Sequence, residues 1–158
     1  MNKYIFIIIF ILLLQKAFSQ NVFIPGDYSR DTAYHNTKTA EIIPKNDTAY
    51  YNRGNNKSLM RDYKGAIQDF NKTIELNPKY AEAYFYRGMT KDDMEDYKGA
   101  IEDYTKEIKL NPKDGEAYFF RGYSKENLGD IKGCCSDWEK AAELGNENAK
   151  ELLKKCCK

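Results

Sequence analysis

Apolar residues from residue 47 onward recur every three or four positions in short runs, which is the spacing of one face of an amphipathic helix. This spacing predicts helices joined in pairs by brief turns. In the first pair, Asp47 and Asp62 are the predicted N-caps, and Asn77-Pro78 ends the second helix. The pattern therefore predicts an all-α chain built from helix–turn–helix units.

The same pattern repeats every 34 residues. Tyr50–Lys79 matches Tyr84–Lys113 at 18 of 30 positions without a gap, and a third copy follows from Tyr118 in the same register. A fixed period of this length is typical of supersecondary units stacked in a row. Such arrays offer an extended binding surface rather than a catalytic pocket.

The repeat resembles the tetratricopeptide repeat (TPR) family. The family pattern is an aromatic residue, a glycine, an alanine, a second aromatic residue and a proline. It is carried by Tyr50, Gly54, Ala66, Phe70 and Pro78, by Tyr84, Gly88, Ala100, Tyr104 and Pro112, and in part by Tyr118, Gly122 and Trp138. The third copy departs from the pattern, with Cys134 in place of the alanine and Asn146 in place of the proline.

This resemblance implies an all-α TPR solenoid, an α–α superhelix of helix–turn–helix repeats. The repeats are expected at 47–80, 81–114 and 115–148, with a C-terminal capping helix at 149–158. In that helix the apolar residues fall on one side and the charged residues on the other. A cap of this kind covers the last apolar face of a solenoid.

The first 19 residues differ in composition from the rest. Lys3 precedes ten consecutive apolar residues, Ile5–Leu14, and Ala17-Phe18-Ser19 places small residues before Gln20. This is the layout of a secretory signal peptide, and ten apolar residues are too few for a membrane-spanning helix. We expect residues 1–19 to be removed and the protein to be exported, to the periplasm or out of the cell. The alternative is an uncleaved N-terminal anchor.

Residues 20–46 form an N-terminal extension. Within it, Lys38–Lys45 matches Lys72–Lys79 at five of eight positions. We therefore expect a degenerate half-repeat from about residue 30, which would cover the first helix of the array. The alternative is a linker that aligns by chance.

Export affects the interpretation of the four cysteines, Cys134, Cys135, Cys156 and Cys157. An even number of cysteines in an oxidising compartment favours disulfides. Adjacent helical residues point about 100° apart, so one cysteine of each pair is expected to bridge, and Cys135–Cys156 is the favoured pairing. A four-cysteine metal site and a redox catalyst are the alternatives, but the usual C-x2–4-C and C-x-x-C spacings are absent. No metal or cofactor is predicted.

Arginine and aspartate also recur at the repeat interval. Arg53, Arg87 and Arg121 share one position of the first helix, and Asp69, Asp103 and Asp137 share one position of the second. The structural interpretation is an arginine–carboxylate pair that bridges the two helices of each unit. The alternative is a ladder of cations for an acidic ligand.

The resemblance also places a binding surface. The concave face of a TPR array is built mainly from first-helix residues that point away from the second helix. The candidates here are Tyr51, Asn55, Phe85, Met89, Phe119 and Tyr123, with Ser58, Asp92 and Glu126 nearby. Because Tyr50, Tyr84 and Tyr118 are assigned to the core, we expect the stripe of Tyr51, Phe85 and Phe119 to be partly exposed and to bind peptide. The TPR subfamily that clamps C-terminal carboxylates has a lysine where Tyr51 stands, so no such clamp is predicted.

The formal charge of +1 gives no reason to propose nucleic acid or an anionic membrane as a partner. His35 is the only histidine, and the common catalytic and nucleotide-binding motifs are absent. The sequence therefore predicts a non-enzymatic protein–protein interaction module. It would bind a protein or an extended peptide on its concave face and act as an adaptor or assembly factor in the cell envelope. The alternative is a structural, self-associating subunit that stacks through an exposed repeat face.

Overall fold

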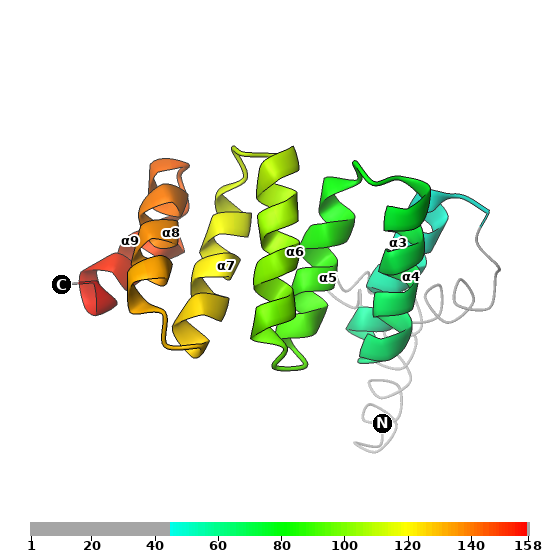
Figure 1. The fold of residues 1–158 in the computed structure, drawn as a ribbon, viewed down its shortest axis with the longest axis horizontal. Coiled ribbons are helices and arrows are strands. Elements are labelled where there is room, and N and C mark those ends of the chain that lie inside the picture. Colours follow the sequence, from blue (N-terminus) through cyan, green and yellow to red (C-terminus); the bar gives the residue numbers. More distant parts are fainter. Residues whose placement is uncertain (1–44, 158) are drawn as a thin grey trace, which may run out of the picture. The chain divides into compact units, whose positions relative to one another are not determined.

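The computed structural model describes residues 45–157, and Figure 1 shows their arrangement. The predicted signal peptide and half-repeat lie outside the described residues. The described residues form helices and no strands: α3 (Asp47–Leu59), α4 (Tyr63–Leu76), α5 (Ala81–Asp92), α6 (Tyr97–Leu110), α7 (Gly115–Asn127), α8 (Ile131–Glu143) and α9 (Glu147–Cys156). None of these helices is long and apolar enough to cross a membrane.

The helices pack as consecutive hairpins. α3 pairs with α4, α5 with α6 and α7 with α8, and each hairpin rests on the next one along the row (Figure 1). The last helix, α9, packs against α8. We call the first helix of each hairpin helix A and the second helix B. The predicted all-α solenoid of helix pairs is confirmed.

Side-chain caps set where the described helices begin, except at α5, whose N-cap Tyr80 makes no side-chain cap hydrogen bond. The predicted cap of α4 is confirmed, because the Asp62 carboxylate accepts a hydrogen bond from the backbone N–H of Gly65. The predicted cap of α3 is wrong by one residue. Asn46 has extended backbone angles and its side chain accepts from the N–H of Ala49 at 2.8 Å. Asp47 is the first helical residue instead, and its carboxylate accepts from the side chain of Asn77 at 2.9 Å.

Glycine allows the two helices of a hairpin to approach closely. A Cβ atom added at Gly54 would lie 3.0 Å from the Phe70 ring, and one added at Gly122 would lie 2.6 Å from the Trp138 indole nitrogen. Phe70, Tyr104 and Trp138 are fully buried as a result. The spacing of glycine and aromatic residue, which recurs in the three repeats, thus creates the packing contact of each hairpin.

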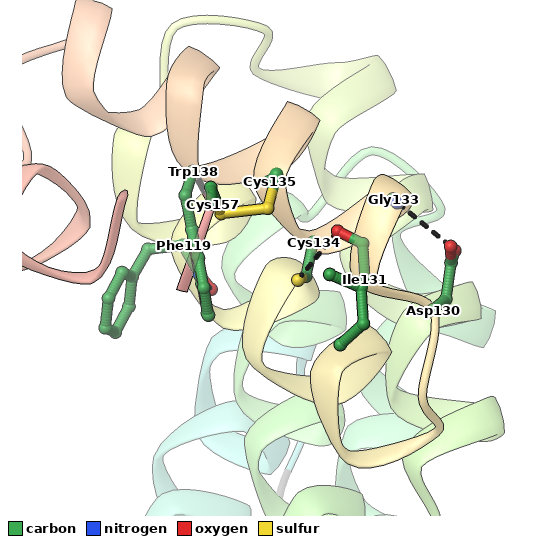
Figure 2. The surroundings of a disulfide bond; sticks show 8 residues. All are labelled: Phe119, Asp130, Ile131, Gly133, Cys134, Cys135, Trp138 and Cys157. Carbon is green, nitrogen blue, oxygen red and sulfur yellow. Dashed lines mark hydrogen bonds between the residues drawn. A yellow bond between two sulfur atoms is a disulfide. The ribbon is translucent and has the colours of Figure 1, made fainter. Parts of the chain in front are cut away.

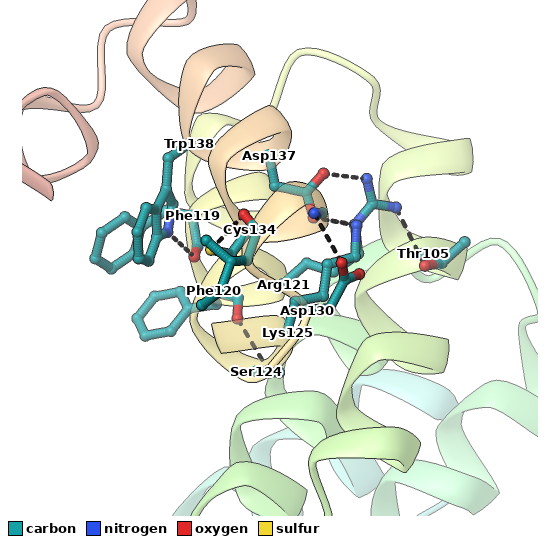
Figure 3. Close-up of polar contacts among 12 residues, drawn as sticks. Thr105, Phe119, Phe120, Arg121, Ser124, Lys125, Asp130, Cys134, Asp137 and Trp138 are labelled. Atoms are coloured by element: carbon teal, nitrogen blue, oxygen red, sulfur yellow. Dashed lines mark hydrogen bonds and ion pairs between the residues drawn. The ribbon is translucent and has the colours of Figure 1, made fainter. Parts of the chain in front are cut away.

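A buried carboxylate also joins the helices of each hairpin, as predicted. In the third hairpin, Arg121 donates two hydrogen bonds to Asp137, at 2.8 and 2.6 Å (Figure 3). The same pairs form between Arg53 and Asp69 and between Arg87 and Asp103. Each arginine also lies over a helix A tyrosine ring, 5.4 to 5.5 Å from its centroid. The structural interpretation of the arginine ladder is therefore confirmed.

A second cation in each hairpin was missed from the sequence. Lys57, Lys91 and Lys125 each place their ammonium group 2.8 Å from the same aspartate that the arginine contacts. The arginines also reach the preceding hairpin, since Arg87 donates to the Asn71 side chain and Arg121 to the Thr105 hydroxyl. The arginines and lysines of the helices A thus form contacts within their own hairpin, and two of the arginines also contact the preceding one.

One disulfide joins the last two described helices. Cys135 in α8 is bonded to Cys157, with their Cα atoms 5.7 Å apart (Figure 2). The favoured Cys135–Cys156 pairing is therefore wrong. Cys157 is the C-cap of α9, with φ −115° and ψ 57°, so departure from helical geometry brings it toward Cys135. The Cys134 thiol is fully buried and donates to the carbonyl of Ile131 at 3.1 Å.

Candidate peptide-binding face

The candidate site lies on the helices A, on the side opposite their arginines. Helix A turns about 100° per residue, so residues just after Gly54 point away from the contact with helix B. We call this side of the three helices the helix-A face. It comprises Thr48, Tyr51, Asn52, Asn55, Ser58 and Leu59 in the first repeat, Glu82, Phe85, Tyr86, Met89, Asp92 and Asp93 in the second, and Glu116, Phe119, Phe120, Tyr123, Glu126 and Asn127 in the third.

The predicted aromatic stripe is only partly accessible. Tyr51 and Phe119 are half-buried, in line with partial exposure. Phe85 is 8% exposed and belongs to the core cluster of the second hairpin, so the expectation of exposure is wrong there. The physical reason is that Phe85 points between hairpins and packs on the rings of Tyr104 and Phe120. Tyr84, which was assigned to the core, is the less buried of the two neighbours.

Aromatic rings form a continuous row along the helix-A face. Successive centroids are 5.0 to 5.7 Å apart, which is the range of favourable aromatic contacts. The row runs through Tyr80, Tyr51, Tyr86, Phe85, Phe120 and Phe119. Tyr86 and Phe120 were not predicted as site residues, although they recur 34 residues apart directly after the predicted stripe. They join one hairpin to the next.

The other predicted site residues surround this row. Asn55 and Met89 are half-buried, and Tyr123 is 43% exposed at the far end of α7. Met89 packs against the core cluster of the second hairpin. Burial raises the pKa of the Tyr51 hydroxyl above its usual value. The face thus presents aromatic surface together with polar side chains.

Two residues near the site bind adjacent helices A together. Ser58 lies 3.1 Å from the hydroxyl of Thr90, and Asp92 accepts from the hydroxyl of Ser124 at 2.8 Å. Asp92 also accepts from the Tyr104 hydroxyl at 2.8 Å. Burial raises the pKa of the Asp92 carboxyl, and these two hydrogen bonds oppose that shift. Ser58 and Asp92 therefore stabilise the contact between adjacent helices A.

No metal-binding cluster accompanies the face in residues 45–157. Within that range no group of three or more histidine, cysteine or carboxylate side chains is placed to hold a metal ion. One buried titratable group is notable: the Glu107 carboxylate is 2% exposed, and its Oε2 atom has no hydrogen-bond partner. Burial and the nearby Asp114 and Glu82 raise its pKa to about 8. Glu107 lies on helix B of the second hairpin.

Comparisons with known proteins agree with this geometry. Models of the tetratricopeptide repeat match residues 48–80 and 81–114. No curated protein matches the chain in sequence. Similar solved structures include the first TPR of Spaghetti (RPAP3) bound to the HSP90 peptide SRMEEVD, with a TM-score of 0.68 and 21% identity over 73% of this chain and 94% of that one.

Two further structures are comparably similar. MamA has a TM-score of 0.66 and 29% identity, over 77% of this chain and 71% of its own. The TPR domain of Arabidopsis OM64 has a TM-score of 0.66 and 25% identity, over 70% of this chain and 93% of that domain. The chain is thus a member of the TPR family with an all-α TPR solenoid fold. TPR solenoids are typically non-enzymatic scaffolds, and the repeats support a protein–protein interaction module in this chain.

Proposed function

We propose that this protein is a non-enzymatic adaptor that binds an extended peptide segment of a partner protein along the helix-A face. The observation that carries the proposal is the continuous aromatic row, which leaves Tyr51, Phe119 and Phe120 half-buried beside the exposed Tyr123. Aromatic side chains supply large contact area at little entropic cost and are enriched at binding hot spots. The face is continuous over three hairpins, as a surface for an extended ligand must be.

The similar structures support peptide binding of this general kind. The TPR domain of Spaghetti is bound to a short peptide of HSP90. That likeness is at the level of the fold, and the residues of the present helix-A face determine which peptide fits it. Since a tyrosine, Tyr51, stands where the carboxylate-clamping subfamily has lysine, the ligand is not expected to be held by its C-terminal carboxylate.

The place of action follows from the N-terminal sequence. A charged start, ten apolar residues and a small-residue cleavage site support export to the cell envelope or beyond. Export also suits the disulfide between Cys135 and Cys157, which is stable in an oxidising compartment. We therefore propose an adaptor or assembly role in the periplasm or outside the cell.

Affinity capture from the cells that produce the protein tests this function. The bait is the full chain with a C-terminal tag, and the matched variant is Tyr123→Ala/Phe119→Ala. We expect a partner that the wild type retains and the variant loses, while circular dichroism shows that both are folded. Retention of identical proteins by both baits would exclude the helix-A face as the binding site.

Self-association is the second candidate, and one observation favours it. No described helix precedes α3, and Ala49 on its outer side is half-buried, whereas its counterparts Ala83 and Ala117 are fully buried by the preceding helix B. A second copy could cover that side. Light scattering over a range of protein concentrations separates the two functions, because an adaptor of the proposed kind stays monomeric.

A further inference from the structure

We infer that the segment bound by the helix-A face is cationic, a stretch of peptide that carries lysine or arginine between apolar residues. This inference rests on the proposed peptide-binding function and specifies the chemistry of its ligand. It depends on three features of the described residues: the sign of the charges on the face, the pairing of the helix A cations with buried carboxylates, and the position of the exposed aromatic rings.

Every charged side chain on the helix-A face is acidic. Glu82 and Glu116 are exposed at the N-terminal ends of α5 and α7, Asp93 is exposed at the other end of α5, and Glu126 is half-buried in α7. None of these four carboxylates forms an ion pair with any residue between 45 and 157. Unpaired carboxylates on a shared surface create a negative potential that attracts cationic ligands and repels acidic ones.

The cations of the same helices are turned away and neutralised. Each helix A carries one arginine and one lysine, and both contact the buried aspartate of its helix B, as Figure 3 shows for Arg121, Lys125 and Asp137. These cations are largely shielded from solvent, with 16% to 21% of each side chain exposed. They could contact an acidic peptide only by giving up contacts with the buried carboxylate, which is unfavourable.

The cations of the C-terminal helix are in part paired. Lys150 contacts Glu147 at 2.6 Å and Lys154 lies 3.9 Å from Glu151, while Lys155 is exposed in the last turn of α9. Glu147 also lines a pocket of about 390 Å³ between the start of α7 and the start of α9, together with Asp114, Glu116 and Lys113. Two of its carboxylates, Asp114 and Glu116, lie beside Lys113, and the third, Glu147, is paired with Lys150. A basic side chain therefore meets net negative charge at this end of the face too.

The exposed aromatic rings also favour a cationic peptide. Tyr123 is 43% exposed, and Phe119 is half-buried one helical turn before it on α7. A guanidinium or ammonium group over such a ring gains a cation–π interaction in addition to its attraction to nearby carboxylates. The apolar residues of the ligand would pack on the remaining aromatic surface. Charge and rings thus favour the same class of peptide.

Selection from a library of random displayed peptides tests the inference. The full chain is immobilised at low salt, the bound peptides are sequenced, and the dissociation constants of enriched peptides are measured by fluorescence anisotropy. The test variant is Glu82→Gln/Glu116→Gln. The matched control, Glu102→Gln/Glu139→Gln, removes the same charge from exposed positions of helices B.

We expect enriched peptides to be rich in lysine and arginine and poor in aspartate and glutamate. The Glu82→Gln/Glu116→Gln variant should bind them about 2–30-fold more weakly, as loss of two exposed ion pairs implies, while the control variant binds as the wild type does. Enrichment of acidic or neutral peptides that still need Tyr123 would overturn the cationic inference and leave the proposed function standing. If no peptide is enriched at all, both the proposed function and this inference fail.

Discussion

The clearest quantitative prediction concerns the buried carboxylate of Glu107. In the other two hairpins the equivalent positions hold Thr73 and Ala141, neither of which is ionised. Glu107 is 2% exposed, and burial raises its pKa from 4.5 to about 8, with help from the carboxylates of Asp114 and Glu82. The folded chain therefore binds a proton at Glu107 far more tightly than the unfolded chain does.

The direction of the pH dependence follows from this difference. Between pH 4.5 and about 8 the folded chain holds the proton and the unfolded chain does not, so the contribution of Glu107 to stability falls as the pH rises. Above about pH 8 the carboxylate is ionised in both states and the full penalty remains. One pKa unit corresponds to about 1.4 kcal/mol, so the penalty amounts to a few kcal/mol.

The substitution Glu107→Gln removes the charge and keeps the shape. At about pH 8.5 the variant should gain about 2 kcal/mol in the free energy of unfolding, because the amide nitrogen replaces an ionised oxygen at a small hydrogen-bonding cost. At about pH 5 the two proteins should be nearly equally stable. Urea unfolding followed by circular dichroism at both pH values measures the difference, in which other titrating groups cancel. A variant that is less stable than the wild type by the same amount at both pH values would refute the reasoning.

Three further predictions concern the scaffold. Phe70→Ala deletes a fully buried ring and should lower the free energy of unfolding by about 3–5 kcal/mol, and an unchanged thermal midpoint would contradict the packing described here. Cys157→Ser removes the disulfide to Cys135, which closes a loop with a sequence separation of 22. The free energy of unfolding in urea should fall by about 3 kcal/mol. Equal unfolding midpoints for the variant and the oxidised wild type would show that the disulfide contributes nothing. Ser124→Ala removes a hydrogen bond to the half-buried Asp92 and should cost about 1 kcal/mol by the same assay, whereas a neutral result would mean that water replaces the hydroxyl.

Much of the fold could be predicted from the sequence because the repeat positions that create it are chemically distinctive. A small residue such as Gly54 opposite a large ring such as Phe70 can be read from spacing alone, and so can an arginine that recurs opposite an aspartate. The lysine partner of each aspartate recurs at the same interval, with Lys57 four residues after Arg53. That spacing was the available signal for the second cation of each ion-pair cluster.

The details of the candidate site were harder to predict. Helical periodicity separates two sides of helix A, but it does not determine how far the next hairpin covers them, and Phe85 is buried because Phe120 of that hairpin packs on it. The disulfide was mispaired for a related reason. Cys157 lies beyond the last helical residue, where the backbone no longer follows the spacing on which the choice of Cys156 was based. In both cases a tertiary contact decides the outcome.

Site-directed photocrosslinking shows directly whether a partner peptide lies on the helix-A face. A photoreactive phenylalanine analogue replaces the exposed Tyr123 in one variant and the exposed Glu102, on helix B of the second hairpin, in another, and both are illuminated in the cells that produce the protein. We predict a discrete crosslinked species from the Tyr123 position that is absent from the Glu102 position. A discrete species from the Glu102 position alone would contradict the claim and place the partner on the outer face of the array.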